Sequence, residues 1–184
     1  MLTGIGGQGV QLAAQVLARG ATLEQRHVLY LGTYGGTMRG GNTDSTVIIG
    51  DGPLSAPPIV AHTWSALAMH HQFWKPLEPK LRRGGVVVVN APVFEAPLDR
   101  EAQRVFEVPA TRIAAELGNP MGASLVLLAA FCSLTQIVKL DALIEAMRAS
   151  VPSYRQQHVE SNVRALRTGW EILPSGSAPA WENV

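Results

Sequence analysis

Short apolar runs alternate with stretches of helical spacing in the first half of the chain. A brief apolar opening and a glycine-rich turn precede a segment whose apolar residues recur at helical intervals: Val10, Ala13, Ala14, Leu17 and Ala21. Residues 27–31 and 44–49 are rich in β-branched or aromatic side chains, which predicts two strands. The valines of residues 86–89 follow two glycines and predict a strand that is buried on both faces of a parallel sheet.

The middle of the chain is predicted to contain a helix over residues 63–73, a strand over residues 105–108 and a helix over residues 110–117. From Asn119 onward the chain is predicted to be largely helical. Asn119 is a candidate N-cap with Pro120 at the first helical position, and Asp141 is a candidate cap of a further helix. The last predicted helix spans residues 153–171 and has one apolar stripe, made of Val159, Val163, Leu166 and Trp170.

Strands that alternate with helices, a central strand of valines and an early glycine turn together predict an α/β, Rossmann-like fold. We expect a three-layer sandwich with a mostly parallel sheet and a helical C-terminal part. The length of 184 residues suits one domain, which we place at residues 1–173. Residues 174–184 are rich in serine, glycine and proline and are predicted to form a mobile tail, although Trp181 could dock on a neighbour.

Composition limits the kinds of partner. Hydrophobic residues make up 47% of the chain and charged residues 16%, whereas charged residues make up about a quarter of a typical soluble protein. The chain therefore has much apolar surface to cover, and a permanent protein partner is one way to cover it. The formal net charge of +1 provides no broad positive field, so nucleic acid and anionic lipid are not expected partners.

The region between Glu116 and Lys139 contains no charged residue, which by charge alone resembles a membrane span. Glycine, proline and polar residues interrupt this region, and only residues 125–132 form a strongly apolar core. It is therefore predicted to be a buried helix and not a membrane helix. No cationic segment followed by an apolar run opens the sequence, so no secretory signal is readable and we expect a cytoplasmic protein.

The chain has a single cysteine, Cys132, and five histidines. One thiol cannot form an intramolecular disulfide or hold an iron–sulfur cluster, which needs about four ligands. Any electron carrier is therefore expected in another chain. His70 and His71 fall on the helix predicted over residues 63–73, where neighbouring side chains point about 100° apart, so no metal site is predicted.

Gly4, Gly6 and Gly9 match the pattern G-x-G-x-x-G between a strand and a helix, where backbone amides and the helix dipole could receive a phosphate or another anion. A dinucleotide site also needs an acidic residue at the end of the second strand to bind the ribose. That end reads Leu31-Gly32-Thr33, and Glu24 precedes the strand. Anion binding and close helix–sheet packing are therefore both favoured over NAD binding.

The segment at residues 33–42, between two predicted strands, combines glycines with polar and aromatic residues that no core requires. Arg39 precedes Gly40 and Gly41 and could present its planar guanidinium to a carboxylate or a phosphate. In the alternative interpretation the glycines supply positive φ angles and Arg39 pairs with Asp44. The sequence leaves both interpretations open.

The glycine turn at residues 4–9, the alanine-rich helix after it and the loop at residues 34–41 together resemble the gamma subunit of the pyruvate:ferredoxin and related 2-oxoacid:ferredoxin oxidoreductases. The likeness continues with Gly118-Asn119-Pro120 and, on the last predicted helix, with Asn162, Ala165 and Gly169. The resemblance covers nearly the whole chain, and the pairing of the two glycine motifs is more specific than either motif alone.

The resemblance implies a complex that oxidatively decarboxylates a 2-oxoacid on thiamine diphosphate, transfers the acyl group to coenzyme A and passes electrons through iron–sulfur clusters to ferredoxin or another acceptor. It implies that thiamine diphosphate belongs to alpha- and beta-type partner subunits and the clusters to an iron–sulfur subunit. The present chain would then hold no cofactor and no catalytic residue and be inactive alone.

The resemblance also places the gamma part near the coenzyme A site. The residues expected to contact this co-substrate are Gly6, Gly7, Gln8, Gly9, Tyr34, Arg39, Gly40, Gly41 and Asn42. Two alternatives remain, a free-standing NAD-dependent reductase and a scaffold subunit that binds no ligand. The sequence does not identify the 2-oxoacid.

Overall fold

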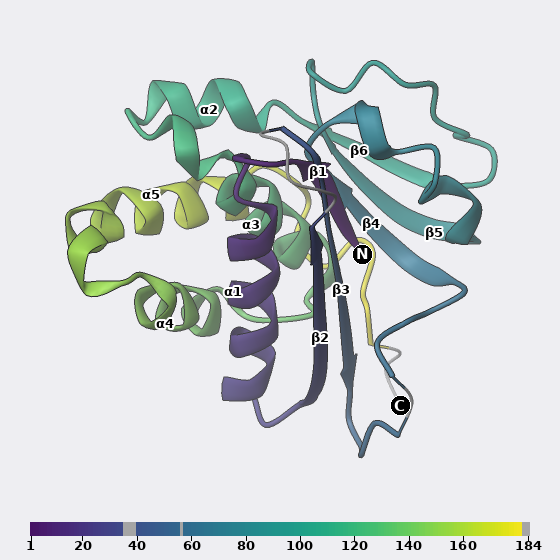
Figure 1. Ribbon diagram of the computed structural model, residues 1–184, viewed down its shortest axis with the longest axis horizontal. Coiled ribbons are helices and arrows are strands. Elements are labelled where there is room, and N and C mark those ends of the chain that lie inside the picture. Colours follow the sequence, from purple (N-terminus) through teal and green to yellow (C-terminus); the bar gives the residue numbers. More distant parts are fainter. Residues whose placement is uncertain (35–39, 56, 182–184) are drawn as a thin grey trace.

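A mixed six-stranded sheet organises the computed structural model, which describes residues 1–34, 40–55 and 57–181 (Figure 1). The strands are β1 (Leu2–Ile5), β2 (His27–Tyr34), β3 (Asn42–Gly50), β4 (Thr63–Ala68), β5 (Leu81–Asn90) and β6 (Arg104–Val108). Their order in the sheet is β2-β3-β1-β4-β5-β6. Strands β1, β4, β5 and β6 are parallel, whereas β3 is antiparallel to both of its neighbours. The predicted α/β fold with a mostly parallel sheet is confirmed.

The α-helices pack together on one face of this sheet. They are α1 (Val10–Leu23), α2 (Ala110–Glu116), α3 (Ala123–Thr135), α4 (Leu140–Ser150) and α5 (Val159–Trp170). Every residue of α3 is buried, because this helix lies in the middle of the layer and contacts the sheet as well as α1, α2, α4 and α5. The prediction of a buried helix in the uncharged region is confirmed. Among the described residues, no helix combines the length and apolarity that crossing a membrane requires.

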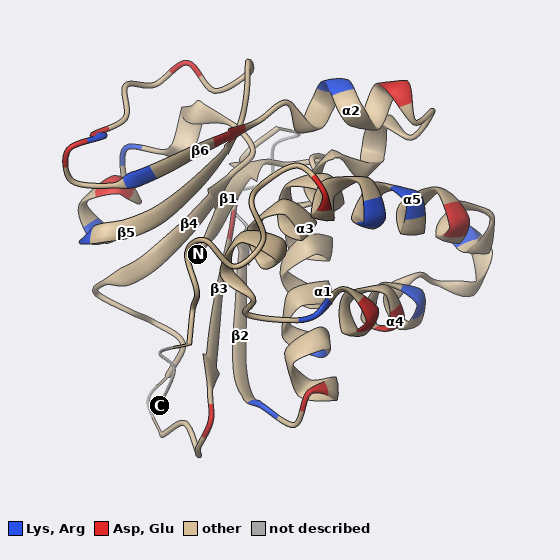
Figure 2. Ribbon diagram, turned by 180° about the vertical axis from the view of Figure 1, so that it is seen from behind, with Lys and Arg blue, Asp and Glu red and all other residues tan. Residues whose placement is uncertain are grey.

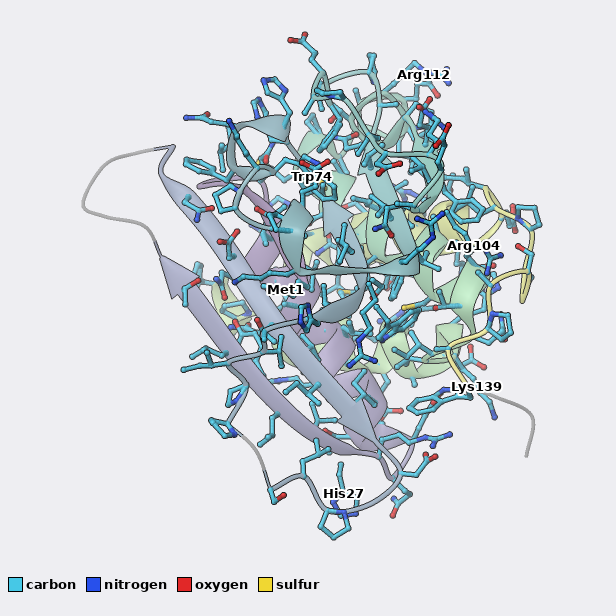
Figure 3. The ribbon with its side chains drawn as sticks, turned by 90° about the vertical axis from the view of Figure 1, so that its right-hand side faces the viewer. Met1, His27, Trp74, Arg104, Arg112 and Lys139 are labelled. Carbon is cyan, nitrogen blue, oxygen red and sulfur yellow. The ribbon has the colours of Figure 1, made fainter. Side chains whose placement is uncertain are left out.

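The opposite face of the sheet has a smaller core. The valine strand contributes to both sides, since Val86 and Val88 pack with the helices whereas Val87 and Val89 pack with Trp74 on the other face. The covering segments there include two 3₁₀ turns, η1 (His71–Phe73) and η2 (Glu78–Lys80), together with the loop after β5. Figure 3 looks onto this face, with the helices behind the strands. In the described part of the chain, the third layer of the expected sandwich is therefore built from turns and loops.

The prediction of a helix over residues 63–73 is wrong. Residues 63–68 form β4, a strand between β1 and β5, and η1 follows it. The apolar residues Ala66, Leu67 and Ala68 are buried by strands that are distant in the sequence, and this pairing outweighs the local helical spacing. The start of the last helix is also later than predicted, because a 3₁₀ segment, η4 (Ser153–His158), precedes α5. Asn119 and Pro120 likewise open a 3₁₀ turn, η3 (Pro120–Gly122), before α3 begins.

The segment after α5 returns to the carboxyl end of α3. Backbone N–H groups of Gly176, Ala178 and Ala180 donate to the carbonyls of Ser133, Leu134 and Thr135 at 2.9, 3.0 and 2.7 Å. These carbonyls belong to the last turn of α3, where no helical amide is available to them. Trp181 docks within the same chain, with the guanidinium of Arg26 4.1 Å from the centre of its ring. The segment expected to be a mobile tail thus has hydrogen-bond partners on α3 as far as Ala180, and its mobility stays a prediction.

Charged residues of both signs are interspersed on α2, α4 and α5 (Figure 2). An i,i+4 ion pair on α2 joins Arg112 to Glu116, and another pair joins Arg148 of α4 to Glu160 of α5. The interior helix α3 has no charged residue. This distribution agrees with the balanced charge of the sequence.

Candidate functional site

The glycine turn lies between β1 and α1, at the carboxyl edge of the parallel strands. Gly9 is the N-cap of α1 with φ of 77°, and Gly7 has φ of 98°. A Cβ atom on Gly9 would lie 2.5 Å from Oγ of Ser124, so both the backbone conformation and the close approach of α3 require glycine there. Gly9 has no side chain with which to cap α1, and no capping hydrogen bond is present among the described residues. The first amides of the helix and its positive dipole end are therefore suited to an anion.

Gln8 helps to close this turn. Its Oε1 accepts a hydrogen bond from the backbone N–H of Ile5 at 3.0 Å, and its own N–H donates to the carbonyl of Ile5 at 3.2 Å. The side-chain oxygen of Gln8 is thus occupied within the turn. Its amide nitrogen remains as a side-chain donor that could contact a ligand.

The second glycine motif lies against the first. The N–H of Gly6 donates to the carbonyl of Gly41 at 2.8 Å, and Ile5 pairs with Asn42 where β1 meets β3. Gly40 has φ of 83°, and a Cβ atom on Gly6 would lie 3.5 Å from its nitrogen. The structure therefore brings Gly6, Gly7, Gln8 and Gly9 together with Gly40, Gly41 and Asn42.

The other residues predicted for the site come from the loop between β2 and β3. Tyr34 ends β2 and pairs with Thr43. Arg39 lies outside the described residues. Asn42 Nδ2 donates to Asp44 Oδ2 at 2.8 Å, and the remaining side-chain oxygen of each is buried without a partner in the part of the chain that the structure describes. Whether Arg39 binds a ligand or pairs with Asp44 thus stays a prediction.

His70 and His71 follow the end of β4, beside the glycine turn, and the sequence did not predict them as site residues. The ladder between β1 and β4 continues to Met69, whose N–H donates to the carbonyl of Thr3 at 2.9 Å. Nδ1 of His70 accepts a hydrogen bond from the N–H of Gln72 at 3.1 Å, and the two imidazole rings stack with centroids 4.4 Å apart. Partial burial, and then the neighbouring His71, lowers the pKa of His70. The neutral, hydrogen-bonding form of its ring is therefore favoured at the carboxyl edge.

The loop before α3 completes the surroundings of the turn. Asn119 Nδ2 donates to Asn162 Oδ1 of α5 at 3.0 Å, and both residues are buried, so the loop is fastened to the last helix. Met121 in this loop is 68% exposed, and its carbonyl would lie 3.8 Å from a Cβ atom on Gly9. An apolar side chain thus stands in solvent beside backbone donors. The resemblance included Asn119 and Asn162 but gave no signal for Met121.

The chemistry available here is binding and orientation. No group of three potential metal ligands occurs among the described residues. Cys132 is buried in α3, and burial raises the pKa of its thiol well above the ordinary range, which is the opposite of an activated nucleophile. The candidate site therefore combines backbone donors, glycines that allow close approach, a neutral imidazole and an exposed methionine.

The chain matches known proteins along nearly its whole length. The family model described as "Pyruvate ferredoxin/flavodoxin oxidoreductase" matches residues 1–172. A 2-oxoglutarate synthase subunit KorC from Methanothermobacter thermautotrophicus is 34% identical over 184 residues, which cover 96% of this chain and 95% of that protein.

Two solved structures are similar to the fold. The gamma subunit of a keto/oxoacid ferredoxin oxidoreductase from Geobacter sulfurreducens superposes with a TM-score of 0.77 at 26% identity, covering 92% of this chain and 94% of that one. A 2-oxoglutarate:ferredoxin oxidoreductase from Magnetococcus marinus, with 2-oxoglutarate, coenzyme A and succinyl-CoA bound, gives a TM-score of 0.82 at 18% identity. The superposition covers 98% of this chain and 32% of that longer one. Because the identity is only 18%, this second similarity concerns the fold alone.

Proposed function

The chain belongs to the pyruvate ferredoxin/flavodoxin oxidoreductase family, as a gamma-type subunit of a multi-subunit 2-oxoacid:ferredoxin oxidoreductase, and we propose that its two glycine turns bind coenzyme A. The observation that carries this proposal is the hydrogen bond from Gly6 to Gly41, which joins both turns into one backbone-lined surface at the amino end of α1. An acyl acceptor bound there would be held by the gamma-type subunit and would react in a neighbouring subunit.

Coenzyme A suits this surface better than the 2-oxoacid does. Coenzyme A has several phosphate groups, and an uncapped helix end, flexible glycines and the guanidinium of Arg39 are all suited to phosphates. A small 2-oxoacid has one carboxylate, which the subunits that perform the decarboxylation must hold close to the reacting carbon. Met121, exposed beside the turn, would give the apolar arm of coenzyme A a surface to lie on.

The remaining cofactors are assigned to partner subunits. The whole sequence has one cysteine, and that cysteine is buried, so this chain does not fit the ligand set of an iron–sulfur cluster. We place the clusters in an iron–sulfur subunit and thiamine diphosphate in alpha- and beta-type subunits, with ferredoxin or another carrier as the acceptor. When bound in those subunits, thiamine diphosphate supplies the chemistry that decarboxylates the 2-oxoacid. We expect the complex in the cytoplasm.

The residues of this chain would orient the acyl acceptor and would not react with it. The amides at the start of α1 would hold one phosphate, Arg39 would neutralise a second charge, and the loop fastened by Asn119 would keep α3 against the turn. The neutral ring of His70 would donate a hydrogen bond from Nε2, because its Nδ1 already accepts one from Gln72. Positioning of this kind lowers a barrier by removing the entropy cost of an encounter.

Steady-state kinetics of the assembled enzyme test the proposal. Arg39→Ala removes one charge-assisted contact, which typically costs about 1.5 to 3 kcal/mol, so kcat/KM for coenzyme A should fall roughly 10- to 150-fold. Arg39→Lys should retain only part of the kcat/KM for coenzyme A, because the point charge of lysine does not reproduce the planar fork of the guanidinium. Arg167→Ala, at an exposed position in the last turn of α5, is the matched control for loss of a surface charge.

The coenzyme A and 2-oxoacid concentrations are varied separately, after size-exclusion chromatography has established that the subunits still associate. If Arg39→Ala leaves the Michaelis constant for coenzyme A unchanged and raises the Michaelis constant for the 2-oxoacid, Arg39 contacts the 2-oxoacid. If association fails, it is an interface residue. Either result would remove the assignment to coenzyme A.

The NAD-dependent alternative is less well supported by the geometry. β1 lies between the antiparallel strand β3 and the parallel strand β4, and β4 is followed by Met69 and His70 and not by the acidic residue that a ribose site needs. Glu24 caps the opposite end of α1, where its Oε1 accepts a hydrogen bond from the N–H of Lys139 at 2.8 Å.

A further inference from the structure

Strand β2 is an open edge of the sheet. Among the described strands it pairs with β3 alone, on one side. It has eight residues, His27–Tyr34, and each of them pairs with one residue of β3 without a bulge. Residues 27–34 include no lysine, arginine, aspartate, glutamate or proline. A long, regular and uncharged edge leaves backbone N–H and C=O groups available to pair with another strand.

The other edge strand, β6, is protected against such pairing. It has five residues, and two of them, Arg104 and Glu107, are charged. Arg104 Nη2 donates to the carbonyl of Ser177 at 2.7 Å, and Glu107 forms an ion pair with Arg100. Short length and charged side chains are common devices that keep an edge strand from pairing with another chain. Of the two edges that the structure describes, only β2 lacks both devices.

The face of β2 that points away from the helices is apolar. Val28 and Tyr30 pack with the helical core. Because side chains alternate along a strand, Leu29 and Leu31 point to the opposite face, where Leu29 pairs with Ile48 of β3. The smaller core on that face includes no described residue of β2 or β3, and Figure 3 shows no helix in front of these two strands. Two leucines are therefore only half-buried at an open edge.

The charges around this edge suit a second copy of the same chain. When two copies of one strand pair antiparallel about a two-fold axis, the strand meets itself. Like charges at opposed positions would destabilise that pair, and β2 has no charged side chain. Helix α1 packs on β2, and its only charged residue is Arg19, whose Nη1 donates to the carbonyl of Ala149 in α4. Both layers at this edge therefore present little charge that a second copy would have to desolvate.

We propose that β2 pairs antiparallel with β2 of a second copy, so that the two sheets join into one continuous sheet. Directly opposed residues of an antiparallel pair point to the same face, so odd positions must oppose odd positions. The register that places Tyr30 opposite Tyr30 of the second copy also places Leu29 opposite Leu31. It brings four leucines together on the open face. This inference is independent of coenzyme A binding, because residues 29–31 are not among those proposed to contact coenzyme A.

The size of this contact indicates a weak dimer. A strand of eight residues is about 27 Å long, and the sheet with its helical layer is roughly 20 Å thick. The contact would then bury roughly 500 Å² on each copy, which is less than the ~800 Å² per partner of a standard interface. We therefore expect a dissociation constant in the micromolar range, on the order of 10 µM.

Sedimentation velocity of the full chain, at concentrations from about 1 to about 200 µM, measures the dimer. Leu29→Lys brings two like charges close together across the axis and should raise the dissociation constant at least about tenfold. Because Leu29 points to the open face, the variant should still fold, with a melting temperature within about 5 °C of the unsubstituted chain. Ile59→Lys, at a position that is 78% exposed and outside the sheet, is the matched control and should leave the dimer unchanged.

Disulfide cross-linking tests the register without adding charge, and it decides the matter if Leu29→Lys does not fold. Chains with Leu29→Cys are mixed with chains with Leu31→Cys and treated with oxidised glutathione. Directly opposed cysteines are close enough to form a disulfide, so the mixture should give a covalent dimer. Each variant alone should give much less, because its two cysteines are then offset along the strands. The native Cys132 is buried and should contribute no cross-link.

Two results would overturn the proposal. Cross-linking in the mixture that is no greater than in the single variants, together with a dimer that survives Leu29→Lys, would mean that the copies meet elsewhere. A chain that stays monomeric at about 200 µM, while Leu29→Lys prevents binding to the other subunits of the complex, would assign this edge to a different subunit.

Discussion

The N–H of Gly6 lies 2.8 Å from the carbonyl oxygen of Gly41, so the turn after β1 and the turn before β3 are hydrogen-bonded to each other. The two motifs are separated by more than thirty residues in the sequence, yet they form one surface. Their glycines serve different purposes there. Gly9 is required by the close approach of α3, whereas a Cβ atom on Gly7 or Gly40 would have no neighbour within 4 Å among the described residues. Substitutions at these glycines should therefore separate strain from steric conflict.

Gly9→Ala should destabilise the fold more than Gly7→Ala. Both substitutions force alanine into the left-handed region, at about 1–2 kcal/mol, but only the Cβ atom at position 9 meets Oγ of Ser124, 2.5 Å away. Urea unfolding measures the free energies. Adding Ser124→Ala to Gly9→Ala should recover part of the loss, because it removes the conflicting oxygen, which has no hydrogen-bond partner among the described residues. Equal losses for Gly7→Ala and Gly9→Ala would show that α3 does not constrain the turn.

Asn162→Ala should lower the free energy of unfolding by about 1–3 kcal/mol, because it leaves the buried amide of Asn119 without its partner 3.0 Å away. A double-mutant cycle with Asn119→Ala isolates the pair, and the second substitution should cost less once the first is present. Additive losses would mean that the two amides do not depend on each other.

Local composition was sufficient to predict the segments that are buried on every side. The uncharged region became α3, and the valines of residues 86–89 became the centre of β5, since both are apolar on every side. The small residues Ala165 and Gly169 were noticed through the resemblance alone, and the structure supplies the reason. A Cβ atom on Gly169 would collide with the carbonyl of Val126, and Ala165 faces Gly122, so α5 crosses α3 at close range.

Long-range pairing was the part that the sequence did not predict. Residues 63–68 have no strong strand signal of their own and become β4 only because β1 and β5 lie on either side. Treating them as a helix hid the fact that His70 follows a strand end beside the glycine turn. The antiparallel direction of β3 was equally unreadable, because strand direction depends on partners that local periodicity does not specify.

Cys132 should be unreactive in the folded protein. It is buried within α3, and burial raises the pKa of its thiol far above the ordinary value, so thiolate is scarce at neutral pH. Titration with a thiol reagent such as DTNB should find no accessible thiol in native buffer and one per chain in urea, because the sequence has a single cysteine. Rapid native labelling would show that α3 opens readily.

The amino group of Met1 should make stability depend on pH in a defined window. Burial lowers its pKa in the folded chain from 8.0 to about 5. Above pH 8 the amine is neutral in both states and has no effect. As the pH falls from 8 to about 5, the unfolded chain binds a proton that the folded chain does not bind, so stability is lost at up to about 1.4 kcal/mol per pH unit. Below about pH 5 both states are protonated and the loss stops growing.

Other groups titrate in the same range, so the quantity to measure is a difference. Urea unfolding of the free chain and of the same chain acetylated at Met1 is compared at several pH values between 5 and 9. The acetylated form cannot bind the proton, and its advantage should be smallest at pH 9 and should grow toward pH 5, by as much as about 4 kcal/mol. An advantage that is the same at every pH would mean that the amine reaches solvent in the folded state and is not buried beside the carbonyl of Ser65.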